Sequence, residues 1–255
     1  FTANYNIRQP LTLTNENGNT TTFTYDANGR VQTQTLPGSG SNYSTYSYDA
    51  RGNLLSAVMT PKSGSGLGTL TTSATYPSSC TNLATCNKPV TTTDSNSQVT
   101  NYFYNANGTP DYVQSPAPSG GAARPEIHYS YSTAQARVKN SSGTIVDQGD
   151  VITLPAGSTT CITGAWSCAT SNQVVTQMAY YGGAGATNLL LQSNTVKLGS
   201  GSPSSTTSYA YDNIGNPTSV TDPVSNVSTM GYAADRQPLL AVSPSVDGSG
   251  SGLRR

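Results

Sequence analysis

Residues 23–30 read FTYDANGR, and residues 46–53 repeat the phrase as YSYDARGN. The phrase is an aromatic residue, a spacer, a tyrosine, an Asp or Asn, two free positions, a glycine and a polar residue. It returns as YFYNANGT at residues 102–109 and as YAYDNIGN at residues 209–216. Repetition of this kind indicates that one structural unit is used several times, so the repeat decides how the rest of the chain is interpreted.

Each copy of the phrase predicts one β-hairpin. In the first copy, Phe23 and Tyr25 alternate with Thr24, as side chains on the two faces of a strand do. Asp26 suits the first position of a turn, and Gly29 supplies the positive φ that closes a three-residue loop with a bulge. The predicted structural repeat positions are Tyr25, Asp26, Gly29, Tyr48, Asp49, Gly52, Tyr104, Asn105, Gly108, Tyr211, Asp212 and Gly215.

The composition favours strands with polar turns. Of the 255 residues, 34% are apolar and 9% are charged, with a formal net charge of zero and 16 tyrosines. Abundant Tyr, Thr and Val are typical of sheets, whereas disordered chains have few aromatic residues and high net charge. We expect no nucleic-acid partner, because the chain has no basic excess to neutralise phosphates, and no membrane span, because no run of 18 apolar residues occurs.

We therefore predict an all-β fold of repeated antiparallel hairpins that pair side by side into a spiralling sheet, a solenoid, or a segment of a hollow shell or tube. Tyrosines of successive hairpins are expected to stack. Because the chain begins at Phe1 within a repeat, we treat residues 1–255 as one repeat region of a longer or assembling chain. The predicted clear repeats are 18–37, 41–60, 98–116 and 205–223, the degenerate repeats are 1–15 and 228–244, and cysteine-loop hairpins are 74–94 and 151–180.

Four cysteines lie in two short-range pairs, each between two strand-like segments. The pairs predict two local disulfides, Cys80 with Cys86 and Cys161 with Cys168, although sequence alone leaves three connectivities open. Disulfides indicate an oxidising compartment and hence export. Zinc is the alternative interpretation, but the spacings are not those of zinc sites, and His128 is the only histidine.

The sequence predicts no catalytic residue, no metal site and no cofactor. His128 is interpreted as a strand residue rather than a general base, and the repeat aspartates as turn formers rather than calcium or glycosidase carboxylates. Asn105 replaces one of them, and an amide is an equally good turn former but no catalytic acid. Trp166, within the second cysteine pair, is a candidate binding aromatic, with packing over its own disulfide as the alternative.

The phrase F/Y-x-Y-D/N-x-x-G-R/N resembles the signature of YD repeats, so the chain is similar to the rearrangement hotspot (Rhs) family. The copies at Tyr25, Tyr48, Tyr104 and Tyr211 carry the resemblance, and looser copies open at Tyr5 and Tyr232. The resemblance implies a spiral of hairpins that closes into a hollow shell, as in bacterial toxin-complex cocoons and teneurin shells. Such shells enclose a toxin or display adhesive surfaces. The self-cleavage motif of cargo-releasing relatives has no match here.

The leading functional hypothesis is a non-enzymatic wall segment of an exported bacterial protein, located outside the cell or at its surface. Its expected partners are other repeat segments of the same chain or of other copies, through edge strands, and an enclosed toxin domain. The alternative is a self-assembling subunit of an extracellular filament or tube. A third hypothesis is a glycan-binding or receptor-binding adhesion module.

Overall fold

The computed structural model describes residues 2–6, 9–38, 42–164, 166–182 and 189–243. Parts of the predicted repeats at 1–15, 41–60 and 228–244, and residue 165 of the predicted cysteine-loop hairpin 151–180, lie outside these ranges. The chain divides into two units, residues 1–116 and residues 117–255. The described ranges contain strands and one 3-10 turn, Thr170–Asn172, and no helix in them is long and apolar enough to cross a membrane.

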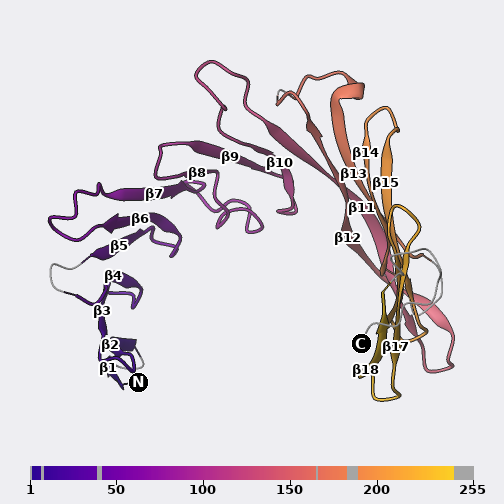
Figure 1. The fold of residues 1–255 in the computed structure, drawn as a ribbon, viewed down its shortest axis with the longest axis horizontal. Helices are drawn as coiled ribbons and strands as arrows, with labels where there is room; N and C mark the ends of the chain where they lie inside the picture. Colours follow the sequence, from indigo (N-terminus) through magenta and orange to yellow (C-terminus); the bar gives the residue numbers. More distant parts are fainter. Residues whose placement is uncertain (1, 7–8, 39–41, 165, 183–188, 244–255) are drawn as a thin grey trace. The chain divides into compact units, whose positions relative to one another are not determined.

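Ten strands make up the first unit, coloured indigo to magenta in Figure 1. They are β1 (Thr2–Asn6), β2 (Gln9–Thr14), β3 (Thr20–Tyr25), β4 (Val31–Thr35), β5 (Tyr43–Tyr48), β6 (Leu54–Thr60), β7 (Leu70–Thr75), β8 (Thr91–Thr93), β9 (Val99–Tyr104) and β10 (Pro110–Gln114). Each strand pairs antiparallel with the next strand along the chain.

Eight strands make up the second unit. They are β11 (Glu126–Lys139), β12 (Ile145–Cys161), β13 (Gln173–Tyr180), β14 (Leu191–Leu198), β15 (Ser204–Tyr211), β16 (Pro217–Thr221), β17 (Val227–Tyr232) and β18 (Pro238–Val242). They also pair antiparallel in chain order. The prediction of an all-β fold of repeated antiparallel hairpins is confirmed.

The turn of the repeat is closed by two backbone hydrogen bonds. In the first clear copy, the N–H of Asp26 donates to the carbonyl of Arg30 at 2.9 Å, and the N–H of Gly29 donates to the carbonyl of Asp26 at 2.9 Å. Gly29 has φ +77°, which glycine adopts without a steric penalty. Just beyond the turn the register shifts by one residue, because Thr24 pairs with Thr33 and Tyr25 pairs with Val31.

The same pair of backbone bonds closes turns at both ends of the strands. It is found at residues 15–19, 26–30, 49–53, 94–98, 105–109, 140–144, 212–216, 222–226 and 233–237. In every one of these turns the fourth residue has positive φ. Three of these fourth residues are not glycine, namely Ser97, Ser225 and Arg236. The repeat phrase therefore marks only some of the places where this turn is used.

Neither unit has a second layer of its own over its strands in the described residues. Cys86 and Cys161 are the only buried hydrophobic side chains among them. Burial instead alternates along the strands: in β3, Phe23 and Tyr25 are half-buried while Thr24 is exposed. The sheet is therefore held together mainly by contacts between neighbouring strands rather than by a core beneath it.

Two turn glycines form a matched pair for testing the fold. Gly18 (φ +76°) has open space around the position of a Cβ, whereas a Cβ on Gly108 (φ +83°) would lie 2.5 Å from the carbonyl oxygen of Ala84. We expect Gly18→Ala to lower the free energy of unfolding by about 1–2 kcal/mol, the cost of a left-handed backbone. We expect Gly108→Ala to cost about 1–3 kcal/mol more, from overpacking. Urea denaturation measures both, and equal losses would contradict the packing of Gly108 against Ala84.

Candidate functional site

The tyrosine of the repeat connects its own hairpin to the preceding one. The hydroxyl of Tyr25, at the end of β3, donates to the carbonyl of Pro10 in β2 at 2.7 Å. The hydroxyl of Tyr48, at the end of β5, donates to the carbonyl of Val31 in β4 at 2.9 Å. We call this hydroxyl-to-carbonyl bond between neighbouring strands a tyrosine link.

Tyrosine links obey a fixed register. Backbone pairing between β2 and β3 ends at Thr12 with Thr22, and the link joins the residue two before Thr12 to the residue three after Thr22. The same offsets recur wherever a link forms. The linked pairs are Pro10 with Tyr25, Val31 with Tyr48, Pro89 with Tyr104, Pro155 with Tyr180, and Leu191 with Tyr211, at 2.7–3.0 Å. Each link therefore joins two strands beyond the point where their backbone pairing ends.

Tyr180 is a repeat tyrosine that sequence analysis missed. It lies in QMAYYGG, where no Asp or Asn follows, so the phrase is lost although its hydroxyl donates to the Pro155 carbonyl at 2.8 Å. The only sequence signal left for this repeat is a tyrosine at the end of a strand in which apolar and polar residues alternate. By the same offsets, Tyr76 and Tyr232 occupy the equivalent positions next to β6 and β16.

The linked tyrosines are partly buried, and a cation lies over the ring of Tyr48. Loss of hydration raises the pKa of Tyr48, Tyr104 and Tyr211 above the ordinary value. The guanidinium of Arg30 lies 4.7 Å from the centre of the Tyr48 ring and also donates to the carbonyl of Asp49 at 2.9 Å. The last residue of one turn thereby touches the tip of the next hairpin.

The predicted stacking of repeat tyrosines is not found between Tyr25 and Tyr48 among the described residues, whereas Tyr181, just after β13, meets Tyr211 of β15 edge to face with ring centroids 6.1 Å apart. The predicted contact between Tyr25 and Tyr48 is replaced by a link from each ring to the backbone of the preceding hairpin. A parallel aromatic stack is found inside one hairpin instead, between Phe103 of β9 and Tyr112 of β10 at 4.0 Å. A hydroxyl reaching a carbonyl needs only one ring per interface, so consecutive rings need not meet.

The turn carboxylates are hydrogen-bond acceptors. Oδ1 of Asp26 accepts from the N–H groups of Asn28 and Arg30, both at 2.9 Å. Asp49 and Asp212 accept from the equivalent two N–H groups of their turns. Because each carboxylate is already satisfied inside its own turn, these aspartates do not converge on a shared site.

These hydrogen bonds favour the ionised form of the turn aspartates and so lower their pKa values. The pKa of Asp26 is lowered, chiefly by the backbone N–H of Arg30. For Asp49 and Asp212 the largest single effect is desolvation, which raises the pKa, but the hydrogen bonds together outweigh it and the net pKa is lowered. The pKa of Asp222, in a turn at the other end of the strands, is lowered too.

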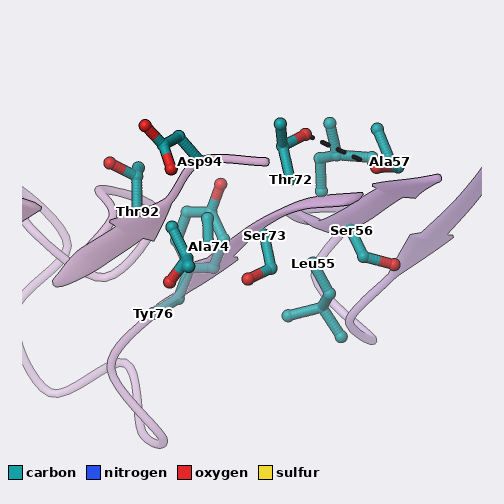
Figure 2. A pocket seen from close by; sticks show the side chains of 11 residues that line it. Leu55, Ser56, Ala57, Thr72, Ser73, Ala74, Tyr76, Thr92 and Asp94 are labelled. Atoms are coloured by element: carbon teal, nitrogen blue, oxygen red, sulfur yellow. Dashed lines mark hydrogen bonds between the residues drawn. The ribbon is translucent and has the colours of Figure 1, made fainter. Parts of the chain in front are cut away.

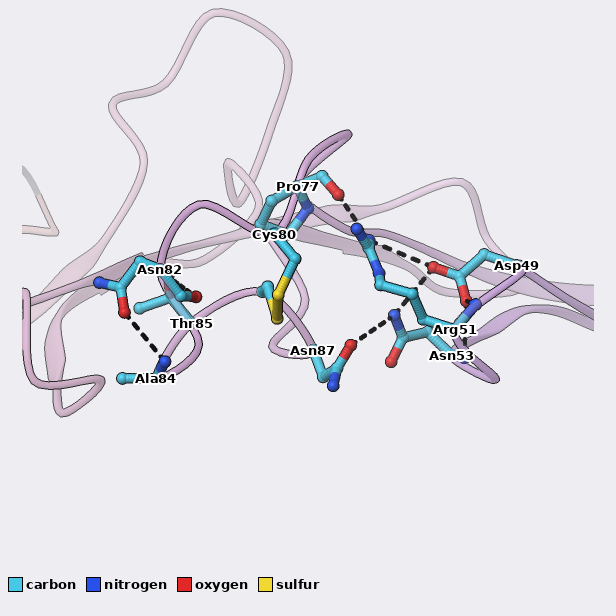
Figure 3. The surroundings of a disulfide bond; sticks show 10 residues. Asp49, Arg51, Asn53, Pro77, Cys80, Asn82, Ala84, Thr85 and Asn87 are labelled. Atoms are coloured by element: carbon cyan, nitrogen blue, oxygen red, sulfur yellow. Dashed lines mark hydrogen bonds and ion pairs between the residues drawn. A yellow bond between two sulfur atoms is a disulfide. The ribbon is translucent and has the colours of Figure 1, made fainter.

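The first cysteine pair closes the long connection between β7 and β8. Cys80 and Cys86 form a disulfide with an S–S distance of 2.04 Å. Figure 3 shows the loop beside the turn of the β5–β6 hairpin, where the Arg51 guanidinium reaches the carbonyl of Pro77. Asn53 of the same turn donates to Oδ1 of Asn87 at 3.2 Å.

The same loop contacts the next hairpin tip along the chain. Nδ2 of Asn82 donates to the carbonyl of Ala106 at 2.8 Å, and Nζ of Lys88 donates to the carbonyl of Gly108. The disulfide loop thus lies between the β5–β6 turn and the β9–β10 turn and bonds to both. This loop connects β7 to β8 at a position where the other hairpins have a short turn.

The second cysteine pair joins the end of β12 to the connection before β13. Cys161 and Cys168 form a disulfide with an S–S distance of 2.07 Å. Trp166, inside this loop, stacks on the imidazole of His128 with ring centroids 3.3 Å apart. Nε2 of His128 lies 2.8 Å from Oε2 of Glu126. Trp166 therefore packs on a strand residue, not simply over its own disulfide.

A hollow of about 330 Å³ opens between β6, β7 and β8 (Figure 2). Leu54, Leu55 and Ala74 give it an apolar lining, with Tyr76 and Asp94 also at its wall. It lies where a link from Tyr76 to Leu54 would close the gap between the strands. Oδ1 of Asp94 accepts from the N–H groups of Asn96 and Gln98 in its own turn.

Within the described part of the chain, no three His, Cys, Asp or Glu residues gather where they could hold a metal ion. The structure places the predicted repeat residues in a series along the hairpin tips rather than together. In the described residues, tyrosines, turns and disulfide loops join neighbouring hairpins to one another.

The RHS Repeat family model matches residues 9–41 and 25–62. Among curated proteins the comparison finds no match. A solved TcdB2-TccC3 structure without its hypervariable C-terminal region is 14% identical, with a TM-score of 0.39, over 88% of this chain and 13% of that one. A TcdB2-TccC3-TEV structure is 13% identical, with a TM-score of 0.40, over 96% and 14%. A porin-like protein from Bacteroides uniformis is 14% identical, with a TM-score of 0.25, over 84% and 89%. This chain thus spans only 13–14% of the TcdB2-TccC3 chains.

Removing one hydroxyl tests a tyrosine link. We expect Tyr48→Phe to lower the free energy of unfolding by about 0.5–1.5 kcal/mol, because the ring stays while the bond to the Val31 carbonyl is lost. Tyr43→Phe, on the same strand with Tyr43 37% exposed, is the matched control and should change it by less than about 0.5 kcal/mol. Urea denaturation measures both variants. Equal effects of the two substitutions would show that the link adds no stability.

The turn aspartates predict a loss of stability in acid. Their pKa values in the folded chain lie below the ordinary 3.8, so their contribution is complete above that value and is lost as pH falls below it. Asp212→Asn should flatten this pH dependence and keep the turn, since Asn15 and Asn140 accept the same backbone bonds. Asp111→Asn, in strand β10, is the control. An unchanged acid profile in Asp212→Asn would refute the assignment.

Proposed function

We propose that this chain, whose residues 9–41 and 25–62 match the RHS Repeat family model, is a non-enzymatic wall segment of an exported bacterial protein. Its work is containment of a cargo, with an enclosed toxin domain as the expected partner, or display of a surface scaffold. Other repeat segments continue the wall at its edges. The observation that carries the proposal is the tyrosine link, which makes each hairpin a structural unit of a series.

The use of the repeat residues supports a structural role. The hydroxyls of Tyr25 and Tyr48 are bonded to backbone carbonyls, and the carboxylates of Asp26 and Asp49 are bonded inside turns. These hydroxyls and carboxylates are therefore used for hydrogen bonds that hold the hairpins and their turns in shape. A nucleophile or a general base needs the opposite, a group free to meet a substrate.

The uncovered sheet faces support a wall in contact with something else. Apolar side chains stand exposed on strands of both units, with Met59 51% exposed, Val151 60% exposed and Leu239 70% exposed. Where such side chains form a contiguous patch on one sheet face, the patch marks a contact surface. In a wall, cargo or neighbouring repeats would cover them.

The two disulfides support export. All four cysteines of the chain are paired, Cys80 with Cys86 and Cys161 with Cys168. Such pairs persist in oxidising surroundings and are rare where glutathione keeps thiols reduced. We place the protein outside the cell or at its surface on this ground.

Imaging and thiol chemistry together test the proposal. Electron microscopy of the protein from its natural source should show closed hollow particles built from one long chain. Long particles that repeat every 255 residues would instead favour the filament hypothesis. Under non-reducing conditions, alkylation followed by mass spectrometry should label none of the four cysteines, and after reduction all four. Free thiols in the native protein would overturn the assignment to an oxidising compartment.

A further inference from the structure

We propose that the hollow between β6, β7 and β8 is a binding site for a small aromatic amine in its cationic form. The aromatic body of the ligand lies in the hollow, and its ammonium group meets the carboxylate of Asp94 at the edge. The inference goes beyond the wall role and does not rest on it, because it concerns one place on the first unit alone.

The hollow lies over two small side chains on neighbouring strands. Ala57 of β6 pairs with Thr72 of β7, and Ala74 follows two residues later on the same face of β7. Figure 2 shows Ala57 and Thr72 on one side of the strands and Ser73 on the other. The volume of about 330 Å³ is near the lower limit of small-molecule sites, which is about 300 Å³. The hollow therefore suits a ligand with a single ring.

The hollow lies where one tyrosine link is missing. Leu54 pairs with Tyr48 at the end of the β5–β6 hairpin, the place that Val31 takes in the hairpin before it. The Val31 carbonyl accepts a link from Tyr48, whereas no described hydroxyl bonds to the Leu54 carbonyl. The ring of Tyr76 lines the hollow instead of crossing to β6. A ligand ring can pack against it, as aromatic pairs in proteins do.

One carboxylate oxygen of Asp94 has no partner among the described residues. Its Oδ1 accepts from the N–H groups of Asn96 and Gln98, at 2.8 and 2.9 Å. The amide of Gln98 donates to the carbonyl of Asn96 at 3.3 Å and leaves Oδ2 of Asp94 unbonded.

The other turn aspartates use both oxygens. Their Oδ2 atoms bond to the side chain of the last residue of the turn at 2.6–2.8 Å, in the turns that begin at Asp26, Asp49, Asp212 and Asp222. Asp94 is also exposed, so a ligand can reach it. An ammonium group would supply the charge-assisted bond that this turn lacks.

The register of the strands selects the length of the ligand. Thr93 pairs with Ser73, so Asp94 lies opposite Thr72. Ala74 is two residues further along β7, about 7 Å away. A two-carbon arm between a ring and an amine covers a distance of this order. A carboxylate repels anions, so the site suits phenethylamine and related arylethylamines rather than aromatic acids.

Amide NMR of the nitrogen-labelled chain measures the binding. The protein is titrated with phenethylamine, with its neutral analogue phenethyl alcohol and with anionic phenylpropanoate. We expect saturable shifts of amide signals on β6, β7 and β8 with phenethylamine, at a Kd on the order of 10 mM or tighter. Phenethyl alcohol should bind about threefold more weakly, as the loss of an exposed ion pair requires, and phenylpropanoate more weakly still. No saturable shift on these strands, or equal affinity for amine and alcohol, overturns the proposal.

Two aspartate variants in equivalent turns test the role of the carboxylate. Asp94→Asn keeps the backbone bonds of the turn, as Asn15 and Asn140 do in theirs, and should bind phenethylamine no better than the alcohol. Asp222→Asn is the matched control and should bind as the parent does, because Oδ2 of Asp222 is already bonded to Asn226. Amine binding that is unchanged in Asp94→Asn refutes the assignment.

Filling the hollow tests its position. Ala74→Leu should weaken binding of phenethylamine at least about fivefold, because a packed side chain leaves no room for the ring. Thr71→Leu adds the same side chain to the same strand, at an exposed position outside the hollow, and should leave binding unchanged. Urea denaturation shows whether each variant is folded. Equal binding by folded Ala74→Leu and the parent would place the ligand elsewhere and overturn the proposal.

Discussion

The structure depends on one hydrogen bond, from a tyrosine hydroxyl to a backbone carbonyl of the strand before it. Backbone pairing between hairpins stops short of the tips, at Thr12 with Thr22 in the first case. Beyond that point the strands would be free to separate. Tyr25 crosses the gap and bonds to Pro10, so the tips stay attached where the ladder does not reach. A sheet without a covering layer gains from this attachment at each of the five interfaces that carry it, since strand-to-strand contacts are its main source of cohesion.

The turn between strands also depends on only a few residues. In seven of the nine turns a carboxylate or amide at the first position accepts two backbone N–H groups. In all nine a fourth residue with positive φ reverses the chain. Both ends of the strands use it, and the version at Asp222 closes on Ser225 rather than on glycine. Turn and tyrosine act together: the turn sets where each strand ends, and the tyrosine joins that end to the neighbouring hairpin.

The hairpins, their turns and the antiparallel order could be predicted from sequence because local chemistry decides them. Eight consecutive residues, 23–30, are enough to predict the hairpin, because they contain Asp26, Gly29 and the alternation of Phe23 with Tyr25. The partner of Tyr25 could not be predicted, because its acceptor is a backbone carbonyl and leaves no mark in the sequence. Tyr180 was missed for a related reason. Its phrase has lost the turn residue, and only three-dimensional register identifies it.

A carbonyl acceptor has one more consequence, which concerns how such chains change over generations. The residues that accept the links are Pro10, Val31, Pro89, Pro155 and Leu191; three of them are proline, and every one accepts through its backbone carbonyl rather than its side chain. The link itself thus asks nothing of the side chains of the repeat before it, and contacts such as Arg30 on the Tyr48 ring are additions to it. Units could be duplicated, deleted or exchanged between genes without re-fitting the link. Genetic recombination would then act on whole hairpins, and the length of the array could drift freely while its architecture stayed the same.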